Sequence, residues 1–319
     1  MRKTRVFSII GVAVILASVL IMFYMKNSEY KAGVVKERQK AEAIGTSKFQ
    51  VNGDENDFKI EYDVVAKTGP IRKLPWDNDD QFLTAIKDNG DLFLLGAYQT
   101  VLRDPLPGEE YNVHLAAKML TGTIIKPGEV FSQNGTVGPY TEERGFQRGP
   151  TYIGTQLTTT IGGGVCKIAS TLYNVATISD LQVIERHAHG MPVPYVPIGQ
   201  DATVAYGVRD FKFMNTTTSP VMIWAQGIDN TLYMAFYGKK SPRKIQWHHQ
   251  ILNVEKASKV YKVNASLAQD TEKVVLEGVD GSTVRSWLTI INSDGTIEMK
   301  NLGISHYKPM ATIIEKGKS

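Results

Sequence analysis

The chain of 319 residues holds a single cysteine, Cys166. A run of three glycines, Gly162, Gly163 and Gly164, comes just before it, and residues with helical spacing come just after it. A helix N-terminus stabilises a thiolate, and its unpaired N–H groups can receive the oxyanion of an attacked carbonyl. Glycines permit the sharp turn and the close approach of a substrate. The pattern therefore predicts a nucleophilic thiol, with the glycines forming the turn and the oxyanion site.

A nucleophilic thiol needs a base, which is most often a histidine. The chain has six histidines, and two of them, His187 and His189, follow the predicted helix in the segment ERHAHG. On a strand these two side chains would point the same way, so the pattern alone leaves the choice between them open. A third group should orient the base, and Glu185, Asp201 and Asp210 are equal candidates for that position.

Two other interpretations compete with catalysis. A lone cysteine is often a small buried core residue, which would alkylate slowly and independently of any histidine. An H-x-H segment can supply two zinc ligands, but the acid that should follow a further ligand at His114 is missing. We therefore predict neither a metal nor a cofactor. The remaining histidines are expected to pack or to face solvent: His114, His248, His249 and His306.

The predicted elements around these residues favour an α+β fold. One helix is predicted over residues 109–122, and a second over the residues that follow Cys166, with Ile168, Leu172 and Val175 on one face. Strands separated by turn residues are then predicted as an antiparallel meander, at residues 202–207, 210–215, 220–227 and 231–238. The residues after 244 alternate strand and turn patterns, which indicates a separate all-β module.

The N-terminal end carries an apolar run. Residues 6–24 hold no charged side chain, and a helix of that length just crosses a bilayer core. A cleaved signal peptide is the alternative, but no small-residue cleavage site follows. We expect a retained single-pass anchor in the cell membrane, with most of the chain extracytoplasmic. The net charge of +4 is too small to suggest nucleic acid as a partner.

These patterns divide the chain into five predicted regions. The predicted boundaries are residues 1–25 for a transmembrane anchor or signal, 26–47 for a stalk, 48–93 for a small N-terminal module or domain entry, 94–238 for the main domain, and 245–319 for the β module.

Several blocks of the main domain resemble the VanW family, named from a vancomycin-resistance cluster. They include NVHLAAKMLTGTIIKPGEVFSQN, VGPYTEERGF, GGGVCKIASTLYN and ERHAHGMPVPYVPIGQDATVAYGVRDFKFMN, within residues 94–226. This sequence departs from the family pattern at Lys167, where glutamine is usual, and at Ala169, where serine or threonine is usual. The last 70 or so residues are similar to a five-glycine domain, a β module often attached to cell-wall enzymes.

The resemblance implies a protein that acts on peptidoglycan. It implies L,D-transpeptidase-like activity on stem peptides, with Cys166 as nucleophile and His189 as the better-matched base, while His187 is the spare. The β module is expected to contact the glycan. Substrate contacts are expected from Arg144, Lys167, Ser170 and Arg186. The alternatives are a non-catalytic peptidoglycan-binding protein associated with glycopeptide resistance, and a cysteine amidase or endopeptidase that passes the thioester to water.

Overall fold

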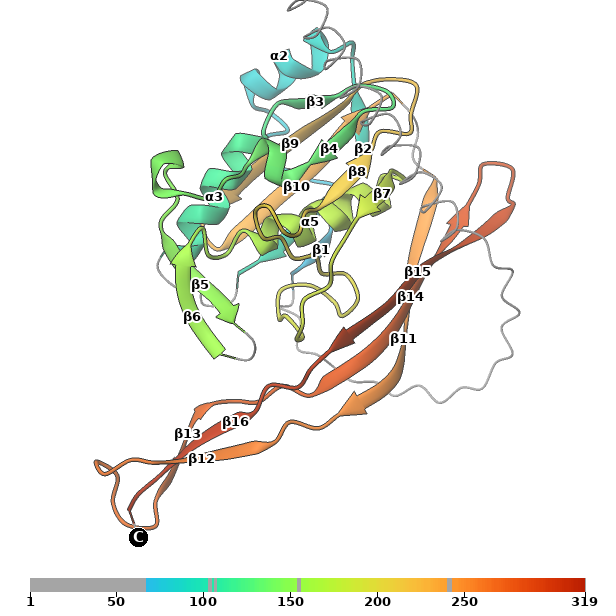
Figure 1. The fold of residues 1–319 in the computed structure, drawn as a ribbon. Coiled ribbons are helices and arrows are strands. Elements are labelled where there is room, and N and C mark those ends of the chain that lie inside the picture. The colour runs from blue at the N-terminus through green and yellow to red at the C-terminus, as the bar shows by residue number, and fades with distance from the viewer. Residues whose placement is uncertain (1–66, 103–104, 106–107, 154–155, 240–242, 319) are drawn as a thin grey trace, which may run out of the picture. The chain divides into compact units, whose positions relative to one another are not determined.

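The computed structural model describes residues 67–102, 105, 108–153, 156–239 and 243–318 (Figure 1). The predicted anchor and stalk, residues 1–47, lie outside this range, as do residues 48–66. Within the described ranges, no helix combines the length and the apolar character needed to cross a membrane.

An antiparallel five-stranded sheet forms the centre of the main domain, in the order β1-β2-β10-β9-β3. Its strands are β1 (Gly69–Pro70), β2 (Phe93–Val101), β3 (Thr123–Ile125), β9 (Val221–Ile228) and β10 (Thr231–Gly238). The predicted strands at 220–227 and 231–238 are confirmed as the hairpin of β9 and β10.

Helices cover both faces of this sheet. Along β10, Met234 and Phe236 pack on one face, beneath α3 (Glu109–Leu120) and α5 (Cys166–Ile178). Ala235 and Tyr237 alternate to the other face, where they pack against α2 (Asp80–Asp88) and the residues before it. The period-two alternation of a strand therefore divides one apolar sequence between two cores. Residues 67–93 pair and pack with the central sheet.

Helix α5 is the helix predicted after the cysteine, and it begins at Cys166 as expected. Its residues from Ile168 to Thr177 are all buried, so the helix lies within the core rather than on a surface. The helix ends where Asp180 adopts a left-handed conformation and the N–H of Leu181 donates to the carbonyl of Ala176 at 3.0 Å.

The predicted four-stranded meander is wrong in its first half. Residues 202–207 form no strand, and only an isolated bridge joins Ala205 to Arg209. The backbone donors there bind other groups, because the N–H of Thr203 donates to the carbonyl of His187. The next strand, β8, pairs in a separate sheet of β4 (Val130–Ser132), β8 (Lys212–Met214) and β7 (Gln182–Glu185).

The remaining elements of the main domain are short. They are α4 (Gln133–Thr136), the 3₁₀ helix η1 (Glu142–Arg144), and a hairpin of β5 (Arg148–Ile153) and β6 (Gln156–Ile161). The hairpin leads directly into the glycine run and α5.

The C-terminal module is built of strands, as predicted. An antiparallel sheet contains β11 (Lys244–Glu255), β14 (Gly281–Ile291) and β15 (Ile297–Tyr307), with β14 in the middle. A second sheet contains β12 (Lys259–Val263), β16 (Thr312–Lys316) and β13 (Glu272–Leu276), in which β16 pairs in parallel with β12.

Candidate active site

The half-buried side chain of Cys166 lines a cleft of about 590 Å³ at the N-terminus of α5. The cleft is lined by the glycine run and by three tyrosines, Tyr140, Tyr195 and Tyr206. Glycine backbone and aromatic rings together make a wall that offers both close backbone approach and apolar contact.

The glycine run is shaped by close contacts with neighbouring backbone. Gly162 and Gly164 have φ angles of +75° and +102°, which favour glycine. A Cβ atom added to Gly163 would lie 2.1 Å from the carbonyl oxygen of Gly149 in β5. The turn therefore admits no larger residue at its centre, and it fixes the start of α5 against the β5–β6 hairpin.

The N–H groups of this turn are not equivalent. The N–H of Gly162 donates to Gln147 and that of Gly163 to Thr160, so neither can serve an oxyanion in this conformation. In the described part of the chain, the N–H groups of Gly164 and Cys166 have no hydrogen-bond acceptor. The available donors thus flank the sulfur at the helix start, where the helix dipole is positive.

Cys166 and His189 are brought together in this cleft. Burial acts to raise the pKa of the Cys166 thiol, but the hydrogen bond to His189 and the charge of that imidazole outweigh it, so the pKa lies below its ordinary value. The hydroxyl of Thr203 lies 3.3 Å from Sγ and adds to the lowering of the pKa. A thiol in such surroundings is poised to react as a thiolate.

His189 is held from its other side by Asp201. The backbone N–H of His189 donates to Oδ2 of Asp201 at 2.7 Å, and Nδ1 lies 2.6 Å from the same oxygen. A carboxylate can only accept, so Nδ1 carries the proton of this bond, which leaves Nε2 as the ring nitrogen available to Cys166. Burial alone would lower the pKa of His189, but the hydrogen bonds to Asp201 and Cys166 raise it. The same contacts lower the pKa of Asp201 against the effect of burial.

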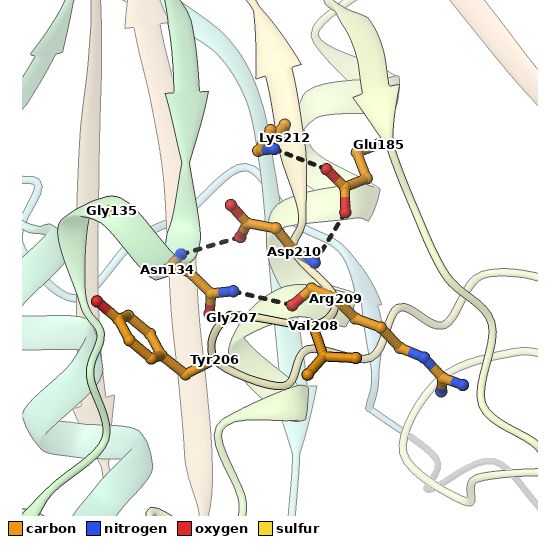
Figure 2. Close-up of a pocket in the computed structure, with 9 residues that line it drawn as sticks. All are labelled: Asn134, Gly135, Glu185, Tyr206, Gly207, Val208, Arg209, Asp210 and Lys212. Carbon is orange, nitrogen blue, oxygen red and sulfur yellow. Dashed lines mark hydrogen bonds and ion pairs between the residues drawn. The ribbon is translucent and has the colours of Figure 1, made fainter.

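The other two candidate acids lie in a neighbouring pocket (Figure 2). Glu185 accepts from Lys212 at 2.7 Å and also contacts Nε2 of His187 at 3.0 Å. Asp210 accepts from the backbone N–H of Asn134 at 2.9 Å. β7 ends at Glu185, so His187 and His189 do not alternate along a strand, and His187 does not line the cysteine cleft.

The predicted substrate contacts are divided among different places. Lys167 lines the cleft, pairs with Glu109, and lies 4.8 Å from the ring centre of Tyr195. Burial lowers the pKa of Lys167 to about 8. Ser170 is buried and exchanges hydrogen bonds with the backbone of Ala202, away from the cleft.

The two predicted arginines do not line the cleft. Arg186 donates to the carboxylate of Asp201 at 2.9 Å and to its carbonyl at 2.7 Å, so it supports the acid. Arg144 lies in η1, with its guanidinium beside the sulfur of Met119. The remaining histidines contact other groups: His114 the carbonyl of Asp229, His248 Thr289, His249 Gln200 and Ser286, and His306 Thr283.

Three contributors to the cleft escaped prediction from the sequence. Thr203 approaches the sulfur, Tyr195 lies 3.3 Å from Nε2 of His189, and Glu109 balances Lys167. Glu109 stands in the first turn of α3, where an acid is expected for the helix dipole alone. Tyr195 lies in a proline-rich run six residues after His189, and this short separation in sequence was the one available signal.

The fold and the site place this chain among α+β proteins that carry a lone cysteine at a helix N-terminus, in a cleft that a histidine also lines. Residues 108–237 match the family model described as VanW like protein, so this segment is similar to that family.

Two curated proteins are similar to this chain in sequence. The uncharacterized protein YoaR of Bacillus subtilis is 35% identical over 143 residues, which cover 45% of this chain and 47% of that protein. The Vancomycin B-type resistance protein VanW of Enterococcus faecalis is 33% identical over 140 residues, which cover 42% of this chain and 51% of that protein. The chain thus spans about half the length of the curated relatives it matches.

Solved structures also match. The G5 domain of an IgA1 protease has a TM-score of 0.17 and 19% identity, covering 25% of this chain and 95% of that one. The G5 domain of HP0197 has a TM-score of 0.14 and 18% identity, covering 23% of this chain and 99% of that one.

Proposed function

We propose that this protein is a membrane-anchored cysteine acyltransferase that modifies peptidoglycan, with L,D-transpeptidase-like activity on stem peptides. The observation that carries the proposal is the connected series of Cys166, His189 and Asp201 at the N-terminus of a buried helix. Each member changes the proton affinity of the next in the direction that thiol catalysis requires. The name of the Enterococcus relative, a vancomycin resistance protein, supports a setting in the cell wall.

The first half of the reaction forms a thioester. Sγ of Cys166 attacks the carbonyl carbon of the residue that precedes the terminal D-amino acid, and His189 holds the proton removed from sulfur. The N–H groups of Gly164 and Cys166 are the proposed donors to the oxyanion. His189 then gives its proton to the departing amine, the C–N bond breaks, and the D-amino acid leaves.

The second half transfers the acyl group. An amine from a neighbouring stem peptide attacks the thioester carbonyl, and His189 accepts the proton that this amine loses. The tetrahedral intermediate collapses with cleavage of the C–S bond, and His189 returns the proton to the sulfur. Attack by water in place of the amine would make the same site an amidase or endopeptidase.

Features of the cleft support a peptide that carries a carboxylate. Lys167 lies within the cleft and pairs with Glu109, and its ammonium has three N–H donors, so it can also bind a substrate carboxylate. Three tyrosines can pack along an extended chain. We assign to Lys167 the binding of the stem carboxylate, a role for which Arg144, Arg186 and Ser170 are not in position.

Mass spectrometry of the whole protein tests the proposal. The full-length protein is incubated with a stem tetrapeptide, beside Cys166→Ala as the matched control. We expect a mass gain equal to the acyl group, absent from the variant, and its discharge when an amine acceptor is added. Discharge only by water would favour the hydrolase. No adduct at saturating peptide, together with slow alkylation of Cys166 in the folded protein, would overturn the proposal in favour of a non-catalytic wall-binding role.

A further inference from the structure

We propose that the C-terminal β module completes the candidate site, with Tyr307 as a positioning residue for Asp201 and, through it, for His189. The inference rests on the thiol chemistry proposed above. It gives the β module a task in that chemistry, beyond any contact with the glycan.

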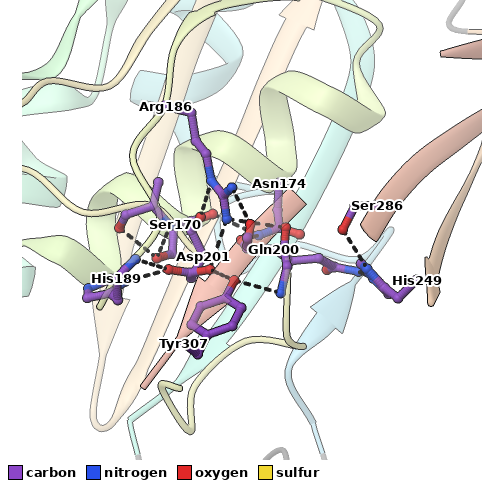
Figure 3. Close-up of polar contacts among 12 residues, drawn as sticks. Ser170, Asn174, Arg186, His189, Gln200, Asp201, His249, Ser286 and Tyr307 are labelled. Atoms are coloured by element: carbon purple, nitrogen blue, oxygen red, sulfur yellow. Dashed lines mark hydrogen bonds and ion pairs between the residues drawn. The ribbon is translucent and has the colours of Figure 1, made fainter. Parts of the chain in front are cut away.

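The central contact is the hydrogen bond from the hydroxyl of Tyr307 to Oδ1 of Asp201, at 2.5 Å (Figure 3). Tyr307 is the last residue of β15 and only 4% exposed, while Asp201 is 1% exposed. The N–H of Gly199 donates to the same hydroxyl oxygen at 3.0 Å, which orients the phenol so that its proton points to the carboxylate.

With this contact the carboxylate of Asp201 has a full set of donors. Oδ2 accepts both bonds from His189, and Oδ1 accepts from Arg186 and from Tyr307. A buried carboxylate with all its acceptor positions filled is fixed in its plane and stays ionised. The orientation of the His189 ring follows from the orientation of this carboxylate, as it does wherever an acid directs a catalytic imidazole.

Neighbouring residues of the module reinforce the same place. Ser305 accepts from Nη1 of Arg186 at 2.8 Å, so the arginine is held between the module and Asp201. The N–H of Lys308 donates to the carbonyl of Gly190 at 2.8 Å, directly after His189 in the chain. Three residues at the end of β15 and just beyond it thus hold the acid, its arginine and the segment that carries the base.

A second group of module residues holds the chain beside Asp201. Nε2 of Gln200 lies 3.0 Å from Nε2 of His249, and Nδ1 of His249 lies 3.1 Å from the hydroxyl of Ser286 (Figure 3). Burial lowers the pKa of His249 to about 4, so the ring is neutral at physiological pH and can accept from the amide of Gln200. The module therefore binds Gln200, which precedes Asp201 in sequence, and Arg186, which contacts its carboxylate.

Loss of the Tyr307 hydroxyl should loosen the acid without removing it. A buried charged oxygen without its donor moves to find another, and the imidazolium that it orients then stabilises the Cys166 thiolate less well. We expect the thiol to become a weaker acid, with its titration moved toward that of an ordinary cysteine.

The test is the pH profile of Cys166 alkylation by iodoacetamide, measured on the full-length protein and on Tyr307→Phe. Tyr261→Phe is the matched control, because Tyr261 lies exposed on β12 of the same module. We expect alkylation of Tyr307→Phe at neutral pH to be about fivefold slower, the factor that corresponds to one hydrogen bond, with its acid limb moved to higher pH. The control should follow the wild-type curve.

A pH profile of Tyr307→Phe that overlies the wild type, with unchanged circular dichroism and melting temperature, would overturn the proposal. If that variant does not fold, Ser305→Ala serves instead, because it removes only the acceptor of Arg186; a shift in the same direction supports the proposal and an unchanged profile overturns it. The readout needs no peptide substrate. A shifted profile without any acyl adduct would therefore sink the transferase alone, and an adduct without a shift would sink this inference alone.

Discussion

Two neighbouring hollows of the main domain share Tyr206 as a common wall, and they differ in what they do to similar side chains. One is the cysteine cleft, and the other is the pocket that contains Glu185, Asp210 and Lys212. Each hollow is lined by a lysine that pairs with a glutamate. Each also has a buried aspartate and a histidine in contact with an acid in its wall or directly behind it. Residue types alone would not tell the two apart.

The difference lies in burial and in partners. In the cysteine cleft the carboxylate of Asp201 is directed at a histidine that in turn contacts a thiol, and burial strengthens each interaction. In the second pocket, Glu185 lies between Lys212 and the more exposed His187, so the charges cancel near solvent. The carboxylate of Asp210 accepts from the backbone N–H of Asn134 in the first turn of α4. The comparison teaches that the partner of an acid decides what it holds: Asp201 orients a histidine beside a thiol, while Asp210 stabilises a turn.

The sharpest way to test this contrast is to remove each histidine in turn. We expect His189→Ala to lower kcat/KM for acyl transfer by about 10³-fold, the usual worth of a general acid–base. His187→Ala should change it less than about threefold, since its partner Glu185 lies outside the cleft. Steady-state kinetics on the two variants measures the effect. Equal losses would place both hollows in one site.

The two aspartates provide the next comparison. Asp201→Asn should reduce kcat/KM by about 10²-fold, the lower end of a general acid–base contribution, because His189 stays in place but loses the negative charge that holds the proton on Nδ1. Asp210→Asn should leave kcat/KM nearly unchanged and instead cost about 1–2 kcal/mol of unfolding free energy. Its carboxylate accepts from the hydroxyl of Ser132 and the N–H of Asn134. Denaturant unfolding and steady-state kinetics on both variants measure these effects. A rate loss in Asp210→Asn without a stability loss would contradict the assignment of Asp210 as a structural acid.

Two glycines, one lining each hollow, distinguish the cost of a steric clash from the cost of backbone strain. A Cβ atom at Gly163 would collide with the backbone of β5, so Gly163→Ala should lower the unfolding free energy by about 3 kcal/mol. Gly207→Ala should lower the unfolding free energy by only about 1 kcal/mol, because Gly207 has a φ of +77° but open space around its Cα. Chemical denaturation with a common m-value is the measurement. A milder effect at Gly163 would mean that the turn can shift.

The smallest expected effect concerns Lys167. Lys167→Gln should raise KM about fivefold with little change in kcat, because the charge contributes to binding rather than to the reacting atoms. The pKa of about 8 means that the lysine carries its charge below that pH and loses it as the pH rises further. Wild-type KM should therefore increase above pH 8, while KM of the variant stays flat. A pH-independent KM in the wild type would remove the lysine from the substrate site.

The sequence predicted those parts of the fold that depend on local pattern. Helices α3 and α5 follow from apolar spacing, and the β9–β10 hairpin from alternation and turn residues. Residues 202–207 have the same alternation but no strand, because the backbone of Thr203 binds His187 and that of Ala202 binds Ser170. Contacts of this kind join segments that are distant in sequence, so the periodicity of a single segment cannot predict them.

The site was predictable to the same degree. The glycine run and the helix start focus attention on Cys166, but the choice among three acids depends on which one the fold buries beside the base. Asp201 is that acid, and the assignment of Arg186 as its support rather than as a substrate contact follows from the same burial. The roles of these residues in catalysis stay predictions that the experiments above address.

One feature of the chain path bears on how such a site could be moved or redesigned. The sulfur stands at the start of α5, while the imidazole, the carboxylate and Thr203 all come from the segment that runs from the end of β7 to residue 203. The relative placement of two pieces of chain therefore sets the geometry of every reacting group. A protein engineer who transplants the turn with its helix, together with that one segment, would carry the proposed nucleophile and its base in register, and would need to replace the contacts that Tyr307, Ser305 and Lys308 make with the segment.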